Sequence, residues 1–418
     1  MYIKNMNIVK NSMKLIGTSI IFLFLAGCGD STNSTAPDAS TSPSTGGLTP
    51  PSPIASANVV PVIVGIGAAG APNIVAVSVR VCVPGSTTQC QTIDNIQVDT
   101  QSSGLRIFST ALAPQIASAL PVVNVAEGQL AECLAFASGY TWGSIRLADL
   151  KIGGESAASL PIHIIADLPD ATIPASCSEN RRSENTVAAF GANGVLGVAV
   201  SPYDCDTDCS ADTQRYYACT GDICSATAVP RAQQIPNPVT RFPVDNNGVI
   251  LKLDAVPDSG AASVNGTLTF GIGTQSNNAL TAAQTVYTTD ASGKLPNSLY
   301  YGMPVKAFLD SGTSTLSLYD STLTPCPVSI GATYFCPTTT QVRSVTLVGQ
   351  KGETGIANFK IANAQTLFDN PSDYAFNDLA STGEPGAVNI GLPFFFGRTV
   401  YSGIDQTESG GAAPFVAF

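Results

Sequence analysis

Two aspartates in this chain are each followed by a run of hydroxyl side chains. Asp99 stands in QVDTQSSGL (97–105) and Asp310 in FLDSGTSTL (308–316). Both stretches fit one pattern: an apolar segment, Asp, Ser or Thr, any residue, Ser or Thr, and Ser. Two carboxylates held close together cannot both ionise, so they would share one proton and could act as general base and general acid. The repeat therefore predicts carboxylate chemistry, whereas a single copy would more often be a turn.

The residue inventory excludes several other kinds of hydrolase. The chain has one histidine, His163, in the strand-like stretch LPIHII. A nucleophilic Ser–His or Cys–His system would have to use it, yet no G-x-S-x-G elbow accompanies it. No H-E-x-x-H zinc motif and no G-x-x-x-x-G-K-[ST] phosphate loop occur either. We expect His163 to be structural, and the carboxylates to carry any catalysis.

The elements that must position the aspartates are predicted to be strands. Helical periodicity is scarce, and short apolar alternations separated by Gly, Pro, Asn and Asp dominate, which predicts a mainly β protein. In NIVAVSVRVCV (73–83) every second residue is a valine. A loop follows, and QTIDNIQVD (91–99) returns as the partner strand, so Asp99 is expected to end a hairpin arm.

A second pattern also recurs, in the same order along the chain. Val195-Leu196-Gly197 follows the Asp99 stretch, and Asn389-Ile390-Gly391, a looser copy, follows the Asp310 stretch. Each aspartate thus has a downstream segment of strand character that ends in glycine. This order predicts two similar lobes, at residues 57–240 and 241–418, with the boundary near 235–245.

On these motifs the sequence resembles the pepsin-type aspartic peptidases over most of residues 73–418. The resemblance implies a bilobal, mainly β fold of double-psi architecture with a cleft between the lobes. It implies that Asp99 and Asp310 form the catalytic dyad and that no cofactor and no metal is needed. It further assigns Thr100 and Ser311 to contacts across the floor of the cleft. The other supporting residues that it implies are Ser102, Gly312 and Thr313.

The stretch SGYTWGSIRLADLKIGG resembles the flap hairpin that closes over substrate in this family. The resemblance places Tyr140, Thr141 and Gly143 on the flap, with Tyr140 and Gly143 at its tip. Two positions depart from the family pattern. Gln101 replaces the glycine of the first loop, and Arg106 stands where a tryptophan commonly orients the flap tyrosine.

Three functions follow as hypotheses. The first is an endopeptidase acting on polypeptides. The second is an inactive pepsin-like protein whose cleft binds peptides or another envelope component, which the departure at Gln101 keeps open. The third is a glycosidase with two carboxylates, for which no symmetric meeting of the two aspartate loops is expected.

Ten cysteines remain when Cys28 is set apart, and an even number in an exported chain predicts disulfides. We expect Cys82–Cys90 and Cys326–Cys336 to close short loops. Cys205, Cys209, Cys219 and Cys224 are expected to pair among themselves, which leaves Cys133 for Cys177.

The first residues predict export and a lipid anchor. Residues 1–27 have three lysines and a short apolar run, as in a secretory signal. Leu25-Ala26-Gly27-Cys28 resembles a bacterial lipoprotein box, which implies a lipid on Cys28 and a site in the cell envelope, facing the periplasm or the surface. Residues 28–56 are rich in Ser, Thr and Pro and are expected to be a disordered tether.

The charge of the chain bears on its partners. The 19 basic and 30 acidic residues become 16 and 30 once the signal segment is removed, which gives a net charge of −14. This balance disfavours nucleic acid as a partner. We expect a monomer that meets a polypeptide substrate or peptide ligand and touches the membrane through the lipid on Cys28.

Overall fold

Alternating apolar residues build the strands that carry both aspartates, as the sequence predicts. The computed structural model describes residues 56–205, 209, 214–330 and 333–418. The predicted signal segment, the lipidation site at Cys28 and nearly all of the tether lie outside the described residues. Within the described residues the protein is mainly β, and its helices are short.

Eleven strands precede residue 240, in the half that contains Asp99. They are β1 (Val59–Gly65), β2 (Ile74–Cys82), β3 (Cys90–Asp99), β4 (Ser103–Phe108), β5 (Asn124–Val125), β6 (Gly128–Ala135), β7 (Tyr140–Ile152), β8 (Glu155–Ile165), β9 (Gly194–Val198), β10 (Tyr216–Thr220) and β11 (Ile223–Ala226), all within the described residues.

Twelve described strands follow residue 240, in the half that contains Asp310. They are β12 (Gly248–Leu253), β13 (Val264–Phe270), β14 (Val286–Thr288), β15 (Leu295–Tyr300), β16 (Met303–Asp310), β17 (Leu316–Leu318), β18 (Gln341–Val348), β19 (Thr354–Ile361), β20 (Ala380–Thr382), β21 (Ala387–Gly391), β22 (Thr399–Gly403) and β23 (Phe415–Ala417). The α-helices are α1 (Pro114–Ala119), α2 (Ala175–Ser178), α3 (Val187–Phe190) and α4 (Ala364–Leu367).

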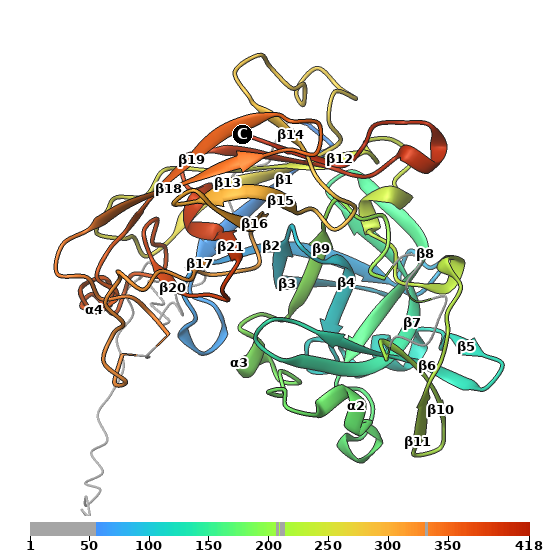
Figure 1. Ribbon diagram of the computed structural model, residues 1–418. Helices are drawn as coiled ribbons and strands as arrows, with labels where there is room; N and C mark the ends of the chain where they lie inside the picture. Colours follow the sequence, from blue (N-terminus) through green and yellow to red (C-terminus); the bar gives the residue numbers. More distant parts are fainter. Residues whose placement is uncertain (1–55, 206–208, 210–213, 331–332) are drawn as a thin grey trace, which may run out of the picture. The chain divides into compact units, whose positions relative to one another are not determined.

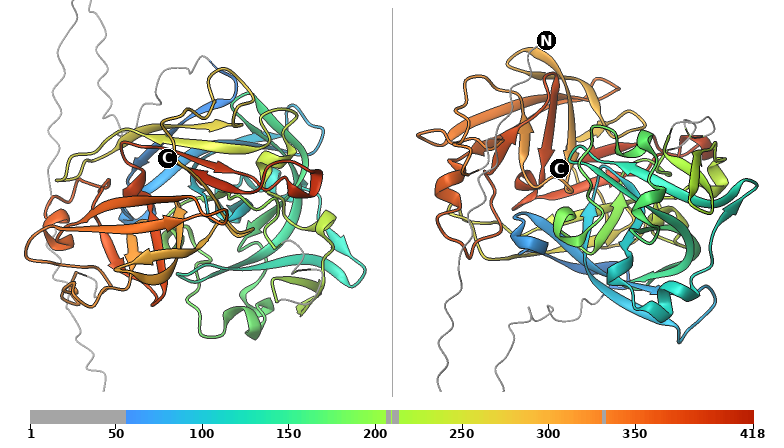
Figure 2. Two further views of the ribbon diagram at one scale, coloured as in Figure 1. Left: turned by 45° about the horizontal axis from the view of Figure 1, so that its top comes forward. Right: turned by 90° about the horizontal axis from the view of Figure 1, so that it is seen from below.

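The described strands form two sheets (Figure 1). The larger has the order β11-β10-β6-β7-β8-β4-β9-β3-β2-β1-β13-β12-β22-β23-β14, with β5 beside β6, and β7 also pairs with β2. The smaller has the order β19-β18-β15-β16-β21-β17-β20. Figure 2 shows most of the blue-to-green strands on one side and most of the orange-to-red strands on the other. Because β1 pairs with β13, the larger sheet continues across the predicted boundary, and the described residues from 56 onward form one compact unit.

The same strand pairing occurs around each aspartate. β3 runs parallel to β9, with Asp99 opposite Gly197, and β4 returns antiparallel on the other side of β9. In the other half β16 runs parallel to β21, with Asp310 opposite Gly391, and β17 returns antiparallel on the other side of β21. The strand whose glycine stands opposite the aspartate therefore lies between the two arms of each aspartate loop.

Five disulfides tie the described segments together, and their pairing agrees with the prediction. Cys133–Cys177 joins β6 to α2, and the others close loops of ten residues or fewer: Cys82–Cys90, Cys205–Cys209, Cys219–Cys224 and Cys326–Cys336. Such links stabilise a fold chiefly by restricting the unfolded chain. Disulfides of this kind are typical of proteins in oxidising, exported environments. None of the described helices has the length and apolar character needed to cross a membrane.

Candidate active site

Asp99 and Asp310 meet at one point of the structure. Each ends its strand, and each residue is largely buried, with 7% and 8% of its surface exposed. A Cβ atom placed on Gly312 would stand 2.7 Å from Asp99 Oδ1 and 3.1 Å from Asp310 Oδ1. The two Oδ1 atoms therefore approach a common point from opposite loops, and we call them the inner oxygens.

Each aspartate is held by its own loop in the same way. The backbone N–H of Gln101 donates to Asp99 Oδ1 at 2.8 Å, and the Ser102 hydroxyl donates to Oδ2 at 2.5 Å. In the second loop Gly312 N–H donates to Asp310 Oδ1 at 2.9 Å, and the Thr313 hydroxyl donates to Oδ2 at 2.7 Å. The Oδ2 atoms, which we call the outer oxygens, thus receive the hydroxyls that the sequence predicts.

Hydrogen bonds also cross between the two loops. The Thr100 hydroxyl donates to Leu309 O at 3.1 Å, and the Ser311 hydroxyl donates to Val98 O at 2.7 Å. Each hydroxyl also accepts the backbone N–H of the other residue, at 3.0 and 3.2 Å. Because Thr100 and Ser311 are buried, these four bonds fix the separation of the two strand ends.

Gln101 fits its loop without the backbone conformation that favours glycine, since it is not among the described residues with positive φ. Its amide Nε2 donates to Leu309 O at 3.2 Å and lies 2.9 Å from the Cβ position of Gly293. Its side chain is therefore engaged with the opposite half. Gly312 is different, because a Cβ there would stand 2.6 Å from Asp99 Cγ.

The environment of Asp310 favours its protonated form. Burial and the charge of Asp99 raise the pKa of Asp310 to about 7, against the opposing effect of hydrogen bonds from Thr313, Asn389 and Gly312 N–H. A carboxyl that keeps its proton to near neutral pH, beside a second carboxylate, is what a shared-proton pair requires.

One residue at this site has no role assigned from the sequence. Asn389 lies on β21, and its Nδ2 donates to Asp310 Oδ2 at 2.7 Å and to Thr313 Oγ1 at 2.9 Å. The sequence feature that could have indicated this role is its position two residues before Gly391. The residue at the matching position of the other half is Val195.

A hairpin lies in the region predicted to form the flap, but the prediction that Tyr140 and Gly143 lie at its tip is wrong. β6 and β7 pair antiparallel, and the turn consists of residues 136–139, closed by a bond from Phe136 N–H to Gly139 O. Tyr140 already belongs to β7 and is buried against Trp142 and the Cys133–Cys177 disulfide.

Thr141 is buried as well, and a Cβ on Gly143 would stand 1.9 Å from Ile164 O, so this glycine permits close packing of strands. The assignment of Tyr140 to the tip failed because the turn lies before it. The exposed turn residues are Ala137 and Ser138.

Arg106 belongs to a buried ionic network. It pairs with Glu132 of β6 at 2.7 Å and with Asp204 at 3.3 Å, and it also donates to Ser103 O at 2.8 Å. His163 Nδ1 lies 2.9 Å from Glu132 Oε2, within the same core, as expected of a structural histidine. Arg106 thus connects the segment after Asp99 to a strand of the hairpin.

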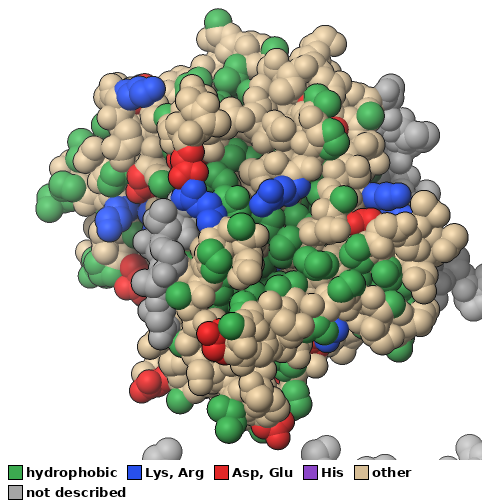
Figure 3. All heavy atoms as spheres, turned by 90° about the vertical axis from the view of Figure 1, so that its right-hand side faces the viewer, with side chains coloured by type: hydrophobic (Ala, Val, Ile, Leu, Met, Phe, Trp, Pro, Cys, Tyr) green, Lys and Arg blue, Asp and Glu red, His purple; other side chains and the backbone are tan. Residues whose placement is uncertain are grey.

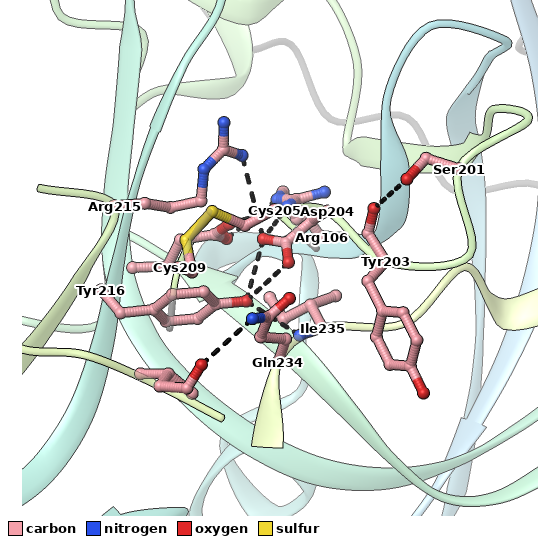
Figure 4. The surroundings of a disulfide bond; sticks show 12 residues. Arg106, Ser201, Tyr203, Asp204, Cys205, Cys209, Arg215, Tyr216, Gln234 and Ile235 are labelled. Carbon is pink, nitrogen blue, oxygen red and sulfur yellow. Dashed lines mark hydrogen bonds and ion pairs between the residues drawn. A yellow bond between two sulfur atoms is a disulfide. The ribbon is translucent and has the colours of Figure 1, made fainter. Parts of the chain in front are cut away.

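Figure 4 shows Asp204 between Arg106, Arg215 and Tyr216, beside the Cys205–Cys209 disulfide. Burial alone would raise the pKa of Glu132, but Arg106 and His163 hold it well below its usual range. Burial and Glu132 raise the pKa of Asp204 well above its usual range. Glu132 therefore balances the charge of Arg106, and Tyr216 donates its hydroxyl to Asp204.

The surface has a hollowed hydrophobic face (Figure 3) and two shallow pockets. Figure 3 shows a face that is hollowed across its middle, where hydrophobic side chains gather and several Lys and Arg side chains stand near the border. Two shallow pockets, of about 400 and 300 Å³, are lined by residues of β1 and β2 and of β15 and β18, away from the aspartates. Among the described residues, no group of three or more His, Cys, Asp or Glu side chains could hold a metal ion.

Comparison with known proteins gives one family. A family model described as "Protein of unknown function (DUF3443)" matches residues 54–418, which include the whole described site. No curated protein matches the chain.

Proposed function

We propose that this chain, which belongs to the DUF3443 family, is an exported aspartic endopeptidase with a pepsin-like architecture of two similar lobes. The observation that carries the proposal is the matched pair of aspartate loops. Each loop pairs with a strand that places a glycine opposite the aspartate, and the loops are joined by hydrogen bonds of Thr100 and Ser311. This repeated pairing supports a double-psi architecture, and the shared inner point supports a dyad of Asp99 and Asp310.

In the proposed reaction Asp310 holds the shared proton and the ionised Asp99 acts as general base. Asp99 takes a proton from a water molecule, whose oxygen forms a bond to the scissile carbonyl carbon. Asp310 gives its proton to the carbonyl oxygen, which yields a gem-diol. The C–N bond then breaks as Asp99 returns its proton to the leaving nitrogen and Asp310 recovers one from a gem-diol hydroxyl. The products are a carboxylic acid and an amine.

The arrangement of the loops also bears on the other hypotheses. The symmetric meeting of Asp99 and Asp310 weighs against a glycosidase, for which none is expected. An inactive binding protein is the second candidate, and Gln101 is the observation that favours it. The pepsin-type pattern has glycine at this position, whereas Gln101 carries a side chain whose amide contacts Leu309 O, next to Asp310.

Cleavage of a denatured protein from about pH 3 to pH 7 tests the proposal. We expect the purified mature chain to cut it and Asp310→Asn to abolish cutting, because an amide cannot supply the shared proton. Asp369→Asn, on an exposed aspartate, is the matched control and should keep full activity. A folded wild-type protein that cuts nothing at any pH would leave the binding protein as the function.

We further propose that Cys28 carries a lipid and anchors the enzyme in the bacterial cell envelope, with a polypeptide as its partner and no nucleic acid. The five disulfides support an exported location. Mass spectrometry of the mature N-terminus tests the anchor. A diacylglyceryl mass on Cys28 that is lost in Cys28→Ala is expected, and an unmodified N-terminus in the wild type would contradict it.

A further inference from the structure

The two halves of the site differ in one polar contact to a carboxylate. Asn389 and Val195 occupy matched places, each two residues before the glycine that pairs with an aspartate. Val195 is fully buried and apolar, whereas Asn389 turns its amide toward Asp310. The outer oxygen of Asp310 therefore accepts two side-chain donors, from Thr313 and Asn389. The outer oxygen of Asp99 accepts one, from Ser102.

The amide is oriented to suit a charged carboxylate. Nδ2 is a donor, and it makes both of its contacts with Asp310 Oδ2 and Thr313 Oγ1. No described residue donates to the buried Oδ1 of Asn389. A buried acceptor without a partner costs free energy that the valine of the other half avoids. The orientation is explained by the bond to Asp310, because a hydrogen bond to a charged oxygen is stronger than one to a neutral oxygen.

We propose that Asn389 is a positioning residue that stabilises the ionised form of Asp310 and so sets the upper pH limit of the dyad. The inference rests on the proposed peptidase function. In that reaction Asp310 becomes charged when it gives its proton to the carbonyl oxygen, so the amide favours the gem-diol stage over bound substrate. In the free protein the same bond lets the last proton of the dyad leave at a lower pH.

The groups that act on Asp310 are few. Asp99 is the charged group that raises its pKa, while Thr313, Asn389 and Gly312 N–H are neutral donors that lower it. Removal of Asn389 therefore leaves the repulsion from Asp99 less opposed. The pKa of Asp310 should therefore rise when the amide is removed, so that Asp310 keeps its proton to a higher pH.

Asn389→Val gives position 389 the residue of the other half. We expect the alkaline limb of the pH profile of kcat/KM to move up by about one pH unit, a tenfold change in proton affinity. At acid pH we expect kcat to fall about three- to tenfold with KM little changed, because the bond strengthens only as charge develops. Asn358→Val, an exposed strand position on β19, is the control and should alter neither quantity.

Asn389→Asp keeps the shape of the side chain, and it is the alternative test variant if Asn389→Val does not fold. It replaces a donor with a carboxylate, so the last proton of the site should leave at a still higher pH than in Asn389→Val. An alkaline limb that stays in place in both folded variants would overturn the role of Asn389.

A second measurement separates this inference from the proposed function. The titration of the Asp310 side-chain carbon, followed by NMR and assigned with Asp310→Asn, needs no catalysis. If the wild type does not cleave but the pKa of Asp310 is still higher in Asn389→Val, the peptidase proposal is contradicted and the role of Asn389 is supported. If the wild type cleaves but the pKa of Asp310 is the same in both proteins, the peptidase proposal stands and the role of Asn389 is contradicted.

Discussion

The Asp99 loop and the Asp310 loop share one backbone design and differ in the side chains around it. Both receive a backbone N–H on the inner oxygen and a hydroxyl on the outer oxygen. Two residues after the aspartate, the first loop has Gln101 and the second has Gly312, so only the first carries a side chain there. Only the second has an amide on its carboxylate, from Asn389. The backbone thus brings the carboxylates together, and the side chains make them unequal.

The two aspartates also differ in the roles proposed for them. Burial and the neighbouring carboxylate raise the pKa of Asp310 to about 7, while the Asn389 amide acts in the opposite direction. In the proposed reaction Asp310 is therefore the member that carries the proton. A symmetric pair would leave the proton divided between the two carboxyls. Substitutions that make the loops more alike, or that break one loop at a time, therefore test the comparison.

The largest effect is expected from removal of either carboxylate. Asp99→Asn deprives the water of its general base, and Asp310→Asn removes the proton donor, so each should lower kcat/KM by more than about 100-fold. Peptide cleavage at acid pH measures the loss. If either variant cleaved the peptide as fast as the wild type, the two loops would not act as a pair.

The third loop position gives the next largest effect. Gly312→Ala would place a Cβ 2.6 Å from Asp99 Cγ, so one of the two aspartate loops must shift, and we expect a loss of activity of about 100-fold. Gln101→Gly removes a neutral hydrogen bond to Leu309 O and packing beside Gly293, but places nothing against the aspartates, so it should keep activity within about threefold of the wild type. Kinetics of both variants on one peptide check the contrast, and an equal loss in both would contradict the assigned crowding.

The pH dependence of stability follows from Asp310. Its pKa in the folded state, about 7, lies above the usual unfolded value of about 4, so its contribution to stability is fully present below pH 4 and is lost as the pH rises through 7. Asp310→Asn cannot lose this contribution. Relative to the wild type, it should gain a few kcal/mol of unfolding free energy between pH 4 and pH 8.

Urea unfolding of both proteins at several pH values measures this difference. Groups remote from the two aspartates titrate alike in both proteins, so their effects cancel in the comparison. A difference that does not change with pH would contradict the shared proton.

The smallest effect is expected from the bonds that join the loops. Thr100→Val and Ser311→Ala each remove a buried hydroxyl that accepts an N–H and donates to a carbonyl across the interface. Each should cost about 1–3 kcal/mol of stability. Because the hydroxyls serve one network, the double variant should cost less than the two single costs together. Strict additivity, measured by urea unfolding, would indicate that the two hydroxyls act independently.

Much of the site could be predicted from the sequence because it repeats. The hydroxyl pattern after Asp99 and Asp310 fixes which atoms can reach each carboxylate, and the loop partners follow from the same spacing. Export chemistry and the short spacing of several cysteines likewise allowed the disulfides to be paired.

The rest depends on register, which spacing alone does not give. Tyr140 was misplaced because the pairing of Ala135 with Tyr140 puts the turn at 136–139, and a tyrosine beside Gly139 reads equally well as turn or strand. The role of Asn389 requires the parallel register of β16 and β21, which sets Asp310 opposite Gly391. The partners of Arg106 come from residues 26 and 98 positions away in the chain.

Binding of a transition-state analogue tests the central claim most directly. A peptide whose scissile carbonyl carbon is replaced by a carbon bearing one hydroxyl should place that hydroxyl between Asp99 and Asp310. Titration calorimetry should show one site per chain at pH 5, with affinity that falls above pH 7 and is lost in both Asp99→Asn and Asp310→Asn. Unchanged binding in either variant would contradict a shared catalytic dyad.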